Sequence, residues 1–163
     1  MRGKQVPPEI ERKFLVEDES WRDHCRDSMR IRQGYLAASA KASVRVRVSG
    51  DRAWLNIKGA TVGISRAEFD YEIPALDAER LMDTLCARPL IEKTRYFVDH
   101  GGHRWEIDVF EGDNAGLIVA EIELASEDEP FELPPWAGEE VSQDSRYYNA
   151  ALVNLPYSRW TLS

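Results

Sequence analysis

Polar and apolar side chains alternate with a period of two along much of the chain. Side chains two residues apart share one face of a β-strand, so this alternation predicts strands. The predicted strands are residues 9–16, 30–37, 43–48, 53–58, 65–73, 93–99, 104–111 and 117–124. Turn-forming residues at 49–51, 101–102 and 112–114 favour hairpins and mostly antiparallel pairing. Eight such strands predict a closed antiparallel β-barrel, because closure removes the exposed sheet edges.

Two segments repeat their apolar residues with a helical period instead. The stripe within residues 19–29 consists of Trp21, Cys25 and Met29. The stripe within residues 74–89 consists of Leu81, Met82, Leu85 and Cys86. Asp77 is the expected N-cap of this second helix, and Pro89 follows its end. A third short helix is expected to begin near Ser142 and to include Tyr147, Ala151 and Leu152.

The acidic run at 127–136, which contains three prolines, is expected to be a loop that wraps the domain, with Phe131 and Trp136 as anchors. The predicted fold is therefore α+β, dominated by strands, with a few flanking helices. The 163 residues suit a single domain that spans 1–163 and can bury a sizeable core without disulfides.

Composition and charge narrow the classes of function. Residues 1–11 lack the apolar stretch of a signal peptide, and no apolar run is long enough to cross a membrane. Cys25 and Cys86 have no metal-binding spacing and are expected to be free thiols of a cytoplasmic protein. The net charge of −8 argues against general affinity for nucleic acid.

The charged faces of the predicted strands could point either into the barrel or out to solvent. Their charged residues are Glu9, Glu11, Lys13, Arg45, Arg47, Lys58, Arg66, Glu68, Asp70, Glu72, Lys93, Arg95, Glu106, Asp108, Glu121 and Glu123. A period of two separates the faces but does not say which one is inside. Two observations favour charges inside a hydrophilic bore: the charges recur in tight i, i+2 pairs, and the acids of the first and last strands would meet on closure.

Charges enclosed in this way imply a ligand. Carboxylates at close range repel one another, and each buried charge costs several kcal/mol unless it is neutralised. A divalent cation would relieve the acids, and a linear chain of phosphates in a narrow bore would relieve the lysines and arginines. Because the donors are all oxygen atoms, Mg²⁺ or Mn²⁺ is the expected cofactor.

The charged motifs resemble those of the CYTH superfamily, also called triphosphate tunnel metalloenzymes. EIERK at 9–13 matches the ExExK signature of that family, and further matches follow in the family's order. These are RVR at 45–47, IKG at 57–59, SRAEFDYEIP at 65–74, EKTRY at 92–96, WEIDVFEG at 105–112 and AEIEL at 120–124. The resemblance covers nearly the whole chain and implies an eight-stranded tunnel that holds a triphosphate and a divalent metal.

The resemblance also implies roles for individual residues. The implied metal ligands are Glu9, Glu11, Asp108, Glu121 and Glu123, which form the expected catalytic set together with Lys13. The implied phosphate-binding residues are Lys13, Arg45, Arg47, Lys58, Arg66, Lys93 and Arg95. Glu68 is expected to orient a neighbouring arginine, and Glu106 receives no role.

The family contains inorganic, thiamine and RNA triphosphatases and class IV adenylate cyclases. The short chain and its QGYL, HGGH and EIEL segments resemble compact bacterial members, which favours hydrolysis of inorganic tripolyphosphate to pyrophosphate and phosphate. The alternatives are a cyclase that converts ATP to cyclic AMP and pyrophosphate, a thiamine or nucleoside triphosphatase, and a non-catalytic polyphosphate-binding module.

Four residues outside the charged rows need separate expectations. Tyr35 is expected to be a packing residue, with a place near the tunnel mouth as the alternative. His100 and His103 are expected on the surface of a hairpin, and Arg146 in a structural ion pair. Apolar side chains left on the outside of the barrel would permit a homodimer.

Overall fold

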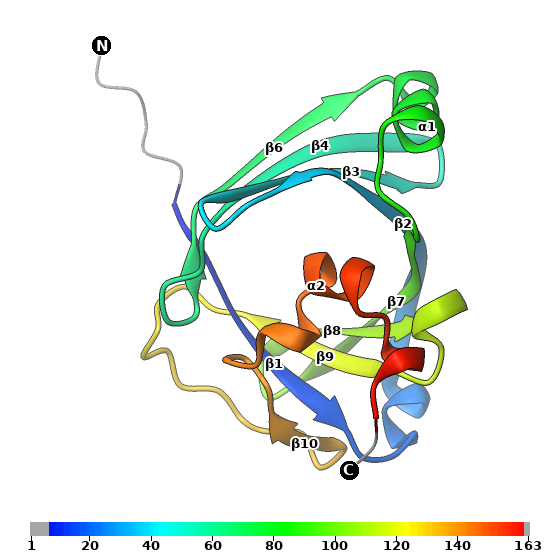
Figure 1. Cartoon of the computed structure of the whole chain (residues 1–163). Helices are drawn as coiled ribbons and strands as arrows, with labels where there is room; N and C mark the ends of the chain where they lie inside the picture. Colours follow the sequence, from blue (N-terminus) through cyan, green and yellow to red (C-terminus); the bar gives the residue numbers. More distant parts are fainter. Residues whose placement is uncertain (1–6, 162–163) are drawn as a thin grey trace.

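The computed structural model describes residues 7–161, in which one long antiparallel sheet curls around a concave face (Figure 1). Its strands are β1 (Glu9–Val16), β2 (Cys25–Ala38), β3 (Ala42–Ser49), β4 (Arg52–Gly59), β5 (Ser65–Arg66), β6 (Glu68–Ile73), β7 (Ile91–His100), β8 (His103–Phe110), β9 (Ile118–Glu123) and β10 (Ala137–Glu140). Their order is β10-β1-β9-β8-β7-β2-β3-β4-β6, and the two-residue β5 pairs separately with β1.

The predicted eight-stranded closed barrel is wrong in closure and in strand number. The sheet has ten strands and is open, with β6 and β10 at its ends. The predicted strand 65–73 divides at Ala67, so that β5 pairs with β1 while β6 pairs with β4. β10 was not predicted and adds to the outer end of β1.

Two connections explain why consecutive strands do not pair all the way round. The 3₁₀ helix Ser20–His24 separates β1 from β2, and helix α1 (Ala75–Thr84) separates β6 from β7. Neither connection is a tight hairpin, so β1 and β2 do not pair with each other, and neither do β6 and β7. Instead, β2 and β7 are neighbours in the sheet and pair with each other. The expected meeting of the first and last predicted strands does occur, because β1 pairs with β9.

The predicted helix at 19–29 is also wrong beyond its first turn. Residues from Cys25 onward belong to β2, which is 14 residues long and pairs with β7. Residues four apart share a face in a strand as well as in a helix, so the apolar stripe is compatible with both. Backbone pairing with β7 makes this segment a strand and not a helix. That pairing is a tertiary contact, which the local sequence pattern does not record.

The other two helices are shorter than predicted. α1 lies within the predicted 74–89, but its N-cap is Pro74, and Asp77 lies in the first turn instead. Near the C-terminus, Tyr147 belongs to the 3₁₀ helix Ser145–Tyr147, and α2 (Asn149–Asn154) follows it.

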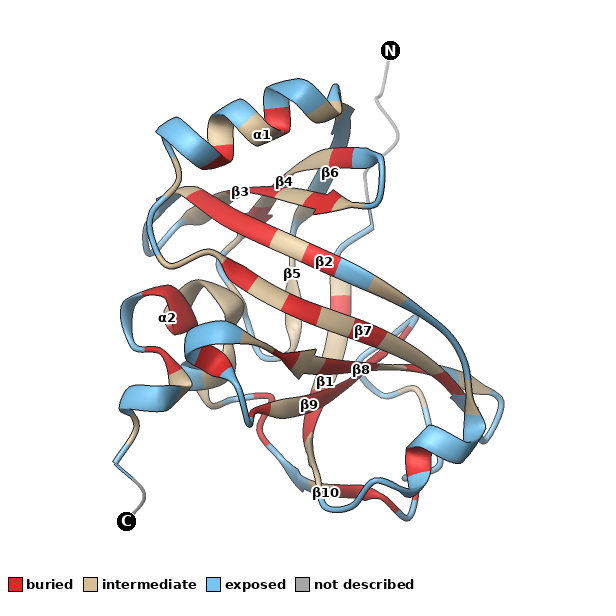
Figure 2. Cartoon of the chain, turned by 90° about the vertical axis from the view of Figure 1, so that its right-hand side faces the viewer, coloured by how far each residue is buried: buried red, intermediate tan, exposed pale blue. Residues whose placement is uncertain are grey.

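The apolar rows of the sheet lie on its convex face and are mostly covered there, except for Phe69 and Tyr71 on the edge strand β6. α1 lies across the outer side of β3 and β4 (Figure 2), where Ala78 and Met82 pack with Val46, Val48 and Ala53. A second cluster of Ile10, Phe14, Trp105, Ile107, Ala120 and Ile122 is covered by Trp136, with Phe131 packed against it. The loop at 127–136 thus wraps the sheet as predicted, and the charged rows are left on the concave face.

α2 closes one end of the concave face (Figure 1). Its Leu152 and Val153 pack against an apolar part of that face made of Tyr35, Ile91, Phe110, Leu117 and Val119. The space that remains between the strands is therefore lined by the charged rows.

Two further expectations concern the chain as a whole. Among residues 7–161, none of the helices is long and apolar enough to span a membrane. The expected lack of a signal peptide rests on residues 1–11, of which residues 1–6 lie outside the described part. Cys25 and Cys86 carry free thiols.

Candidate active site

The charged rows surround a cavity of about 230 Å³, called the inner cavity below. Its lining residues are Glu9, Glu11, Lys13, Arg45, Arg47, Lys58, Arg66, Glu68, Asp70, Lys93, Arg95, Glu106, Glu121, Glu123 and Asn149. The lining contains every residue predicted to bind phosphate and four of the five predicted metal ligands. The exception is Asp108, which lies behind the cavity wall with no exposed surface.

Strand register explains how residues distant in sequence meet here. On β1 and β9, Glu11 lies opposite Glu123, and Lys13 lies opposite Glu121. Directly opposed side chains of an antiparallel pair have Cβ atoms about 5 Å apart, so each i, i+2 pair forms a continuous charged row with its neighbour. β5 adds Arg66 opposite Glu9 on the other side of β1.

Lys13 and Glu121 form the centre of the acidic side. Lys13 Nζ donates to Glu121 Oε1 at 2.8 Å and lies 3.2 Å from a carboxylate oxygen of Glu11. Burial alone would lower the pKa of Lys13, but Glu11 and Glu121 outweigh it and raise the pKa above its ordinary value. Burial would raise the pKa of Glu121, yet Lys13 and Arg95 hold it well below its usual range. Both groups are therefore charged at neutral pH.

Asp108 organises two cations from behind the wall. Its carboxylate accepts from Lys93 Nζ at 2.6 Å and from two nitrogens of Arg95 at 2.7 and 2.8 Å. Arg95 also pairs with Glu106, a residue for which the sequence suggested no role. Burial lowers the pKa of Lys93 to about 8, against the opposing effect of Asp108. These contacts fix the positions of both cations, which also line the inner cavity.

Acids at the β1–β5 side have contrasting environments. Glu9 lies 2.9 Å from Lys58 Nζ and 3.1 Å from Arg66 Nε; although burial opposes ionisation, these cations lower its pKa to about 2. Glu68 lies 3.5 Å from Lys58, so its partner is a lysine and not the expected arginine. Burial, with Glu9 and Asp70, raises the pKa of Glu68 to about 7.

Glu123 lies among other acids and forms no ion pair in the described chain. Burial and the neighbouring Glu9 and Glu11 raise its pKa. Like charges that face each other across a strand pair are destabilising, so the opposed Glu11 and Glu123 favour a positive charge between them. Their oxygen donors suit Mg²⁺ or Mn²⁺.

Within residues 7–161, no three acidic, histidine or cysteine side chains converge into a ready-made metal cage. Mg²⁺ is commonly held by one or two carboxylates together with substrate phosphates and water, and does not need such a cage. The carboxylates therefore fit a metal ion whose remaining coordination positions are filled by substrate phosphates and water.

Three neutral residues of the site were missed from the sequence. Asn56 and Gln33 are buried on the concave face, and Asn149 reaches the cavity from α2. Asn56 shares the face of Lys58, and Gln33 lies opposite Arg47 in the β2–β3 register. Alternation could have indicated the first two as polar residues in a charged row, whereas Asn149 depends on the docking of α2.

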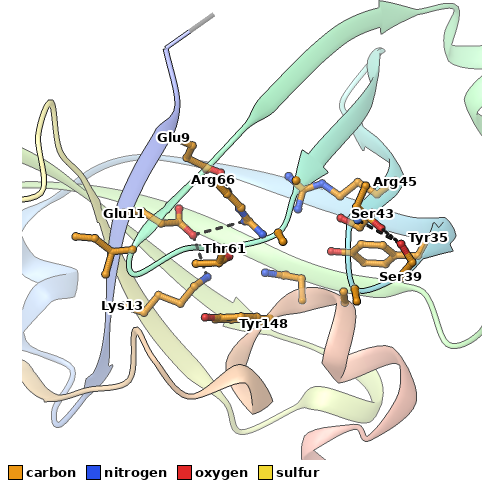
Figure 3. A pocket seen from close by; sticks show the side chains of 18 of the residues that line it. Glu9, Glu11, Lys13, Tyr35, Ser39, Ser43, Arg45, Thr61, Arg66 and Tyr148 are labelled. Atoms are coloured by element: carbon orange, nitrogen blue, oxygen red, sulfur yellow. Dashed lines mark hydrogen bonds and ion pairs between the residues drawn. The ribbon is translucent and has the colours of Figure 1, made fainter.

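A second, outer cavity of about 340 Å³ adjoins the inner one and shares Glu9, Glu11, Lys13, Arg45 and Arg66 with it. Its walls add Tyr35 and Tyr148 together with small residues such as Ser39 (Figure 3). Tyr35 thus packs beside α2, as expected, and also lines this cavity.

The remaining candidates lie away from the cavities. His100 lies 3.2 Å from Glu132, and His103 lies 3.3 Å from Glu129, both at the β7–β8 hairpin. Arg146 forms an exposed pair with Asp144 at 2.6 Å. These positions match the surface and structural roles expected of them.

A curled antiparallel sheet whose concave face carries paired acids and clustered cations defines a polyanion-binding β-protein. The chain belongs to the CYTH domain family, whose model matches residues 7–151. It is 44% identical to the inorganic triphosphatase of Acetivibrio thermocellus, across 93% of this chain and 97% of that protein. Identity to the inorganic triphosphatase of Nitrosomonas europaea is 38%, across 89% and 96%. The crystal structure of the inorganic triphosphatase NE1496 superposes with a TM-score of 0.63 at 35% identity, covering 93% and 97%.

Proposed function

We propose that this chain is an inorganic triphosphatase that hydrolyses tripolyphosphate to pyrophosphate and phosphate, with Mg²⁺ or Mn²⁺ as cofactor. The observation that carries the proposal is the inner cavity, where seven cations and a row of acids face one another across about 230 Å³. An elongated, highly charged anion together with a divalent cation matches the volume, the cations and the acids of this cavity. Identity of 44% to an inorganic triphosphatase along nearly the whole chain supports the same substrate.

The cations bind and orient the substrate. Arg45, Arg47 and Arg95 reach the cavity from β3 and β7, and planar guanidinium groups can hold phosphate oxygens through two hydrogen bonds. Lysines contribute point charges, including Lys13 next to the acids. Catalysis of phosphoryl transfer depends mainly on such positioning and on stabilising the charge of the transition state.

The proposed metal ligands are the acids of β1 and β9. Glu11 and Glu123 face each other in register, with Glu9 and Glu121 next along each strand. When bound, a divalent cation would neutralise phosphate charge and lower the pKa of a water molecule. For Asp108, also predicted as a ligand, the contacts with Lys93 and Arg95 favour a positioning role instead.

A second candidate substrate follows from the outer cavity. Its tyrosines and small side chains leave about 340 Å³ next to the phosphate-binding residues. That space would admit the organic part of a nucleoside or thiamine triphosphate. ATP and thiamine triphosphate therefore belong in the test as competitors of tripolyphosphate.

The test is product analysis with purified protein. Tripolyphosphate, ATP and thiamine triphosphate are incubated in turn with Mg²⁺, with Mn²⁺ and with excess chelator. We expect phosphate and pyrophosphate from tripolyphosphate with either metal, slower release from the organic substrates, and no turnover with chelator. Cyclic AMP and pyrophosphate from ATP would identify a cyclase, and binding without turnover would identify a non-catalytic module.

The proposal also includes the cellular location, the domain extent and the oligomeric state of the chain. We place it in the cytoplasm as a single domain over residues 1–163, consistent with the free thiols of Cys25 and Cys86. Phe69 and Tyr71 are exposed on the edge strand β6, which would allow a homodimer. Light scattering would determine the oligomeric state.

A further inference from the structure

Two of the seven cavity cations differ from the others in their partners. Five have carboxylate oxygens within 4.0 Å: Lys13, Lys58, Arg66, Lys93 and Arg95. Within the described part of the chain, Arg45 and Arg47 have no such partner. Both come from the RVR segment of β3 and lie on its concave side. Their positive charge is therefore not cancelled by an adjacent acid.

Each of these arginines is held by a neutral amide. Arg45 Nε donates to Asn56 Oδ1 at 3.0 Å, and Arg47 Nε donates to Gln33 Oε1 at 3.0 Å. In both cases the amide stands directly opposite its arginine in the strand register, on β4 for Asn56 and on β2 for Gln33. Asn56 and Gln33 are only 2% and 0% exposed, so these contacts are shielded from water.

The two amides are themselves fixed by further hydrogen bonds. Asn56 Nδ2 donates to Asp70, its neighbour across β4 and β6. Gln33 Nε2 donates to Asn149 Oδ1 at 3.3 Å, and the same oxygen accepts from Lys93 Nζ at 3.2 Å. These hydrogen bonds leave each amide oxygen facing its arginine. Through Asn149, the hydrogen-bond network of Gln33 and Lys93 extends to α2.

The choice of amide over carboxylate has an electrostatic consequence. A carboxylate at Nε would neutralise the guanidinium and compete with phosphate for it, whereas an amide oxygen fixes the orientation and leaves the charge free. Burial, with the nearby Arg45 and Arg95, lowers the pKa of Arg47 to about 10, so it remains protonated at neutral pH. Arg45 Nη2 is buried without a hydrogen-bond partner in the described chain. This donor is available to an incoming oxygen.

We propose that Asn56 and Gln33 are positioning residues that aim Arg45 and Arg47 at the triphosphate while leaving their charge uncompensated. The inference rests on the proposed function, since it assigns the two arginines to substrate. It adds a distinction within the site: acid-paired cations form the structural frame, and the amide-held arginines provide locally uncompensated positive charge that binds the anion.

The test replaces each amide by its isosteric acid. Gln33→Glu and Asn56→Asp place a carboxylate about 3 Å from Nε with almost no change in size, and they also remove the amide donors to Asn149 and Asp70. We expect the KM for tripolyphosphate to rise about tenfold or more, with a much smaller change in kcat, because a charged partner competes with phosphate. The exposed Asn154→Asp is the matched control that adds the same charge away from the inner cavity, and it should behave like the wild type.

A double-mutant cycle separates positioning from a structural role. If Gln33 acts through Arg47, Gln33→Met, which removes the amide without adding a charge, should add little to the KM increase already caused by Arg47→Ala. Unchanged KM in both acid variants, or additive effects in the cycle, would overturn the inference. A wild-type protein that does not turn over tripolyphosphate would overturn the proposed function instead.

Discussion

Glu121 connects the two sides of the site at the scale of a single residue. Its carboxylate accepts from Lys13 at 2.8 Å and from Arg95 at 3.3 Å, and the side chain is buried. Removing one member of a buried ion pair costs about 3–5 kcal/mol, because the remaining charges lose their compensation. We expect Glu121→Ala to lower the stability and to reduce turnover about a hundredfold or more. Denaturant unfolding and steady-state kinetics would measure the two effects.

Glu9→Ala tests the same side of the cavity. Glu9 holds Lys58 and Arg66, so its loss releases two cations as well as a proposed metal ligand. Turnover is expected to fall by a similar factor of about a hundred. His100→Ala at the β7–β8 hairpin is the control and should keep nearly full activity. Unimpaired turnover in either acid variant would refute the metal assignment.

Glu68 predicts a pH dependence of stability. Its pKa in the folded protein is about 7, above the ordinary 4.5, mainly because of burial. Protonation of Glu68 therefore stabilises the folded state at low pH, and this contribution is lost as the pH rises through about 7. We expect Glu68→Gln to raise the melting temperature relative to the wild type at pH 8 more than at pH 5.

The exposed Glu139→Gln is the control for this measurement and should show no such difference between the two pH values. The assignment of the raised pKa to Glu68 would fail if Glu68→Gln shifted the melting temperature equally at pH 5 and pH 8.

At the scale of elements, Gly34 lets β2 pass close to the connection that follows α1. A Cβ at this position would lie 2.7 Å from Cys86 Sγ and 2.9 Å from Leu90 Cδ2. We expect Gly34→Ala to destabilise the fold by about 1–3 kcal/mol, since overpacking forces neighbours to move. Gly59→Ala, whose Cβ would meet only ordinary contacts, should cost less in chemical denaturation. Equal costs at the two glycines would contradict the close approach.

Most of the elements were predictable because alternation is a local property. β1, β3, β4, β7, β8 and β9 lie within one or two residues of the predicted ranges. The errors fall where a neighbour decided the outcome. Residues 25–29 belong to β2 and not to a helix, because they pair with β7. The predicted strand 65–73 divides at Ala67, because β5 pairs with β1 and β6 pairs with β4.

At the scale of the whole molecule, the net charge does not describe the charge around the inner cavity. The chain carries −8, whereas the inner cavity is lined by seven cations and seven acids, and two of these cations, Arg45 and Arg47, have no adjacent acid in the described chain. Tripolyphosphate without a metal should therefore stabilise the fold, by about 2.7 kcal/mol at one hundred times its Kd. Thermal unfolding would measure this, and added salt should weaken the effect. A melting temperature that does not respond to tripolyphosphate would contradict an anion site.

The sequence by itself determined which residues share a face, because side-chain direction in a strand follows from a period of two. It therefore contained the charged rows, the apolar rows and nearly all of the proposed site residues. The tight pairing of the charges already favoured an inward direction for the charged face, and the concave face confirms it. Only the tertiary structure decided that the sheet stays open and that Asp108 lies behind the cavity wall. Those outcomes depend on strand partners, on α1 and the 127–136 loop covering the apolar face, and on α2 bringing Asn149 to the cavity. Such contacts join residues far apart in the chain, which no local periodicity records.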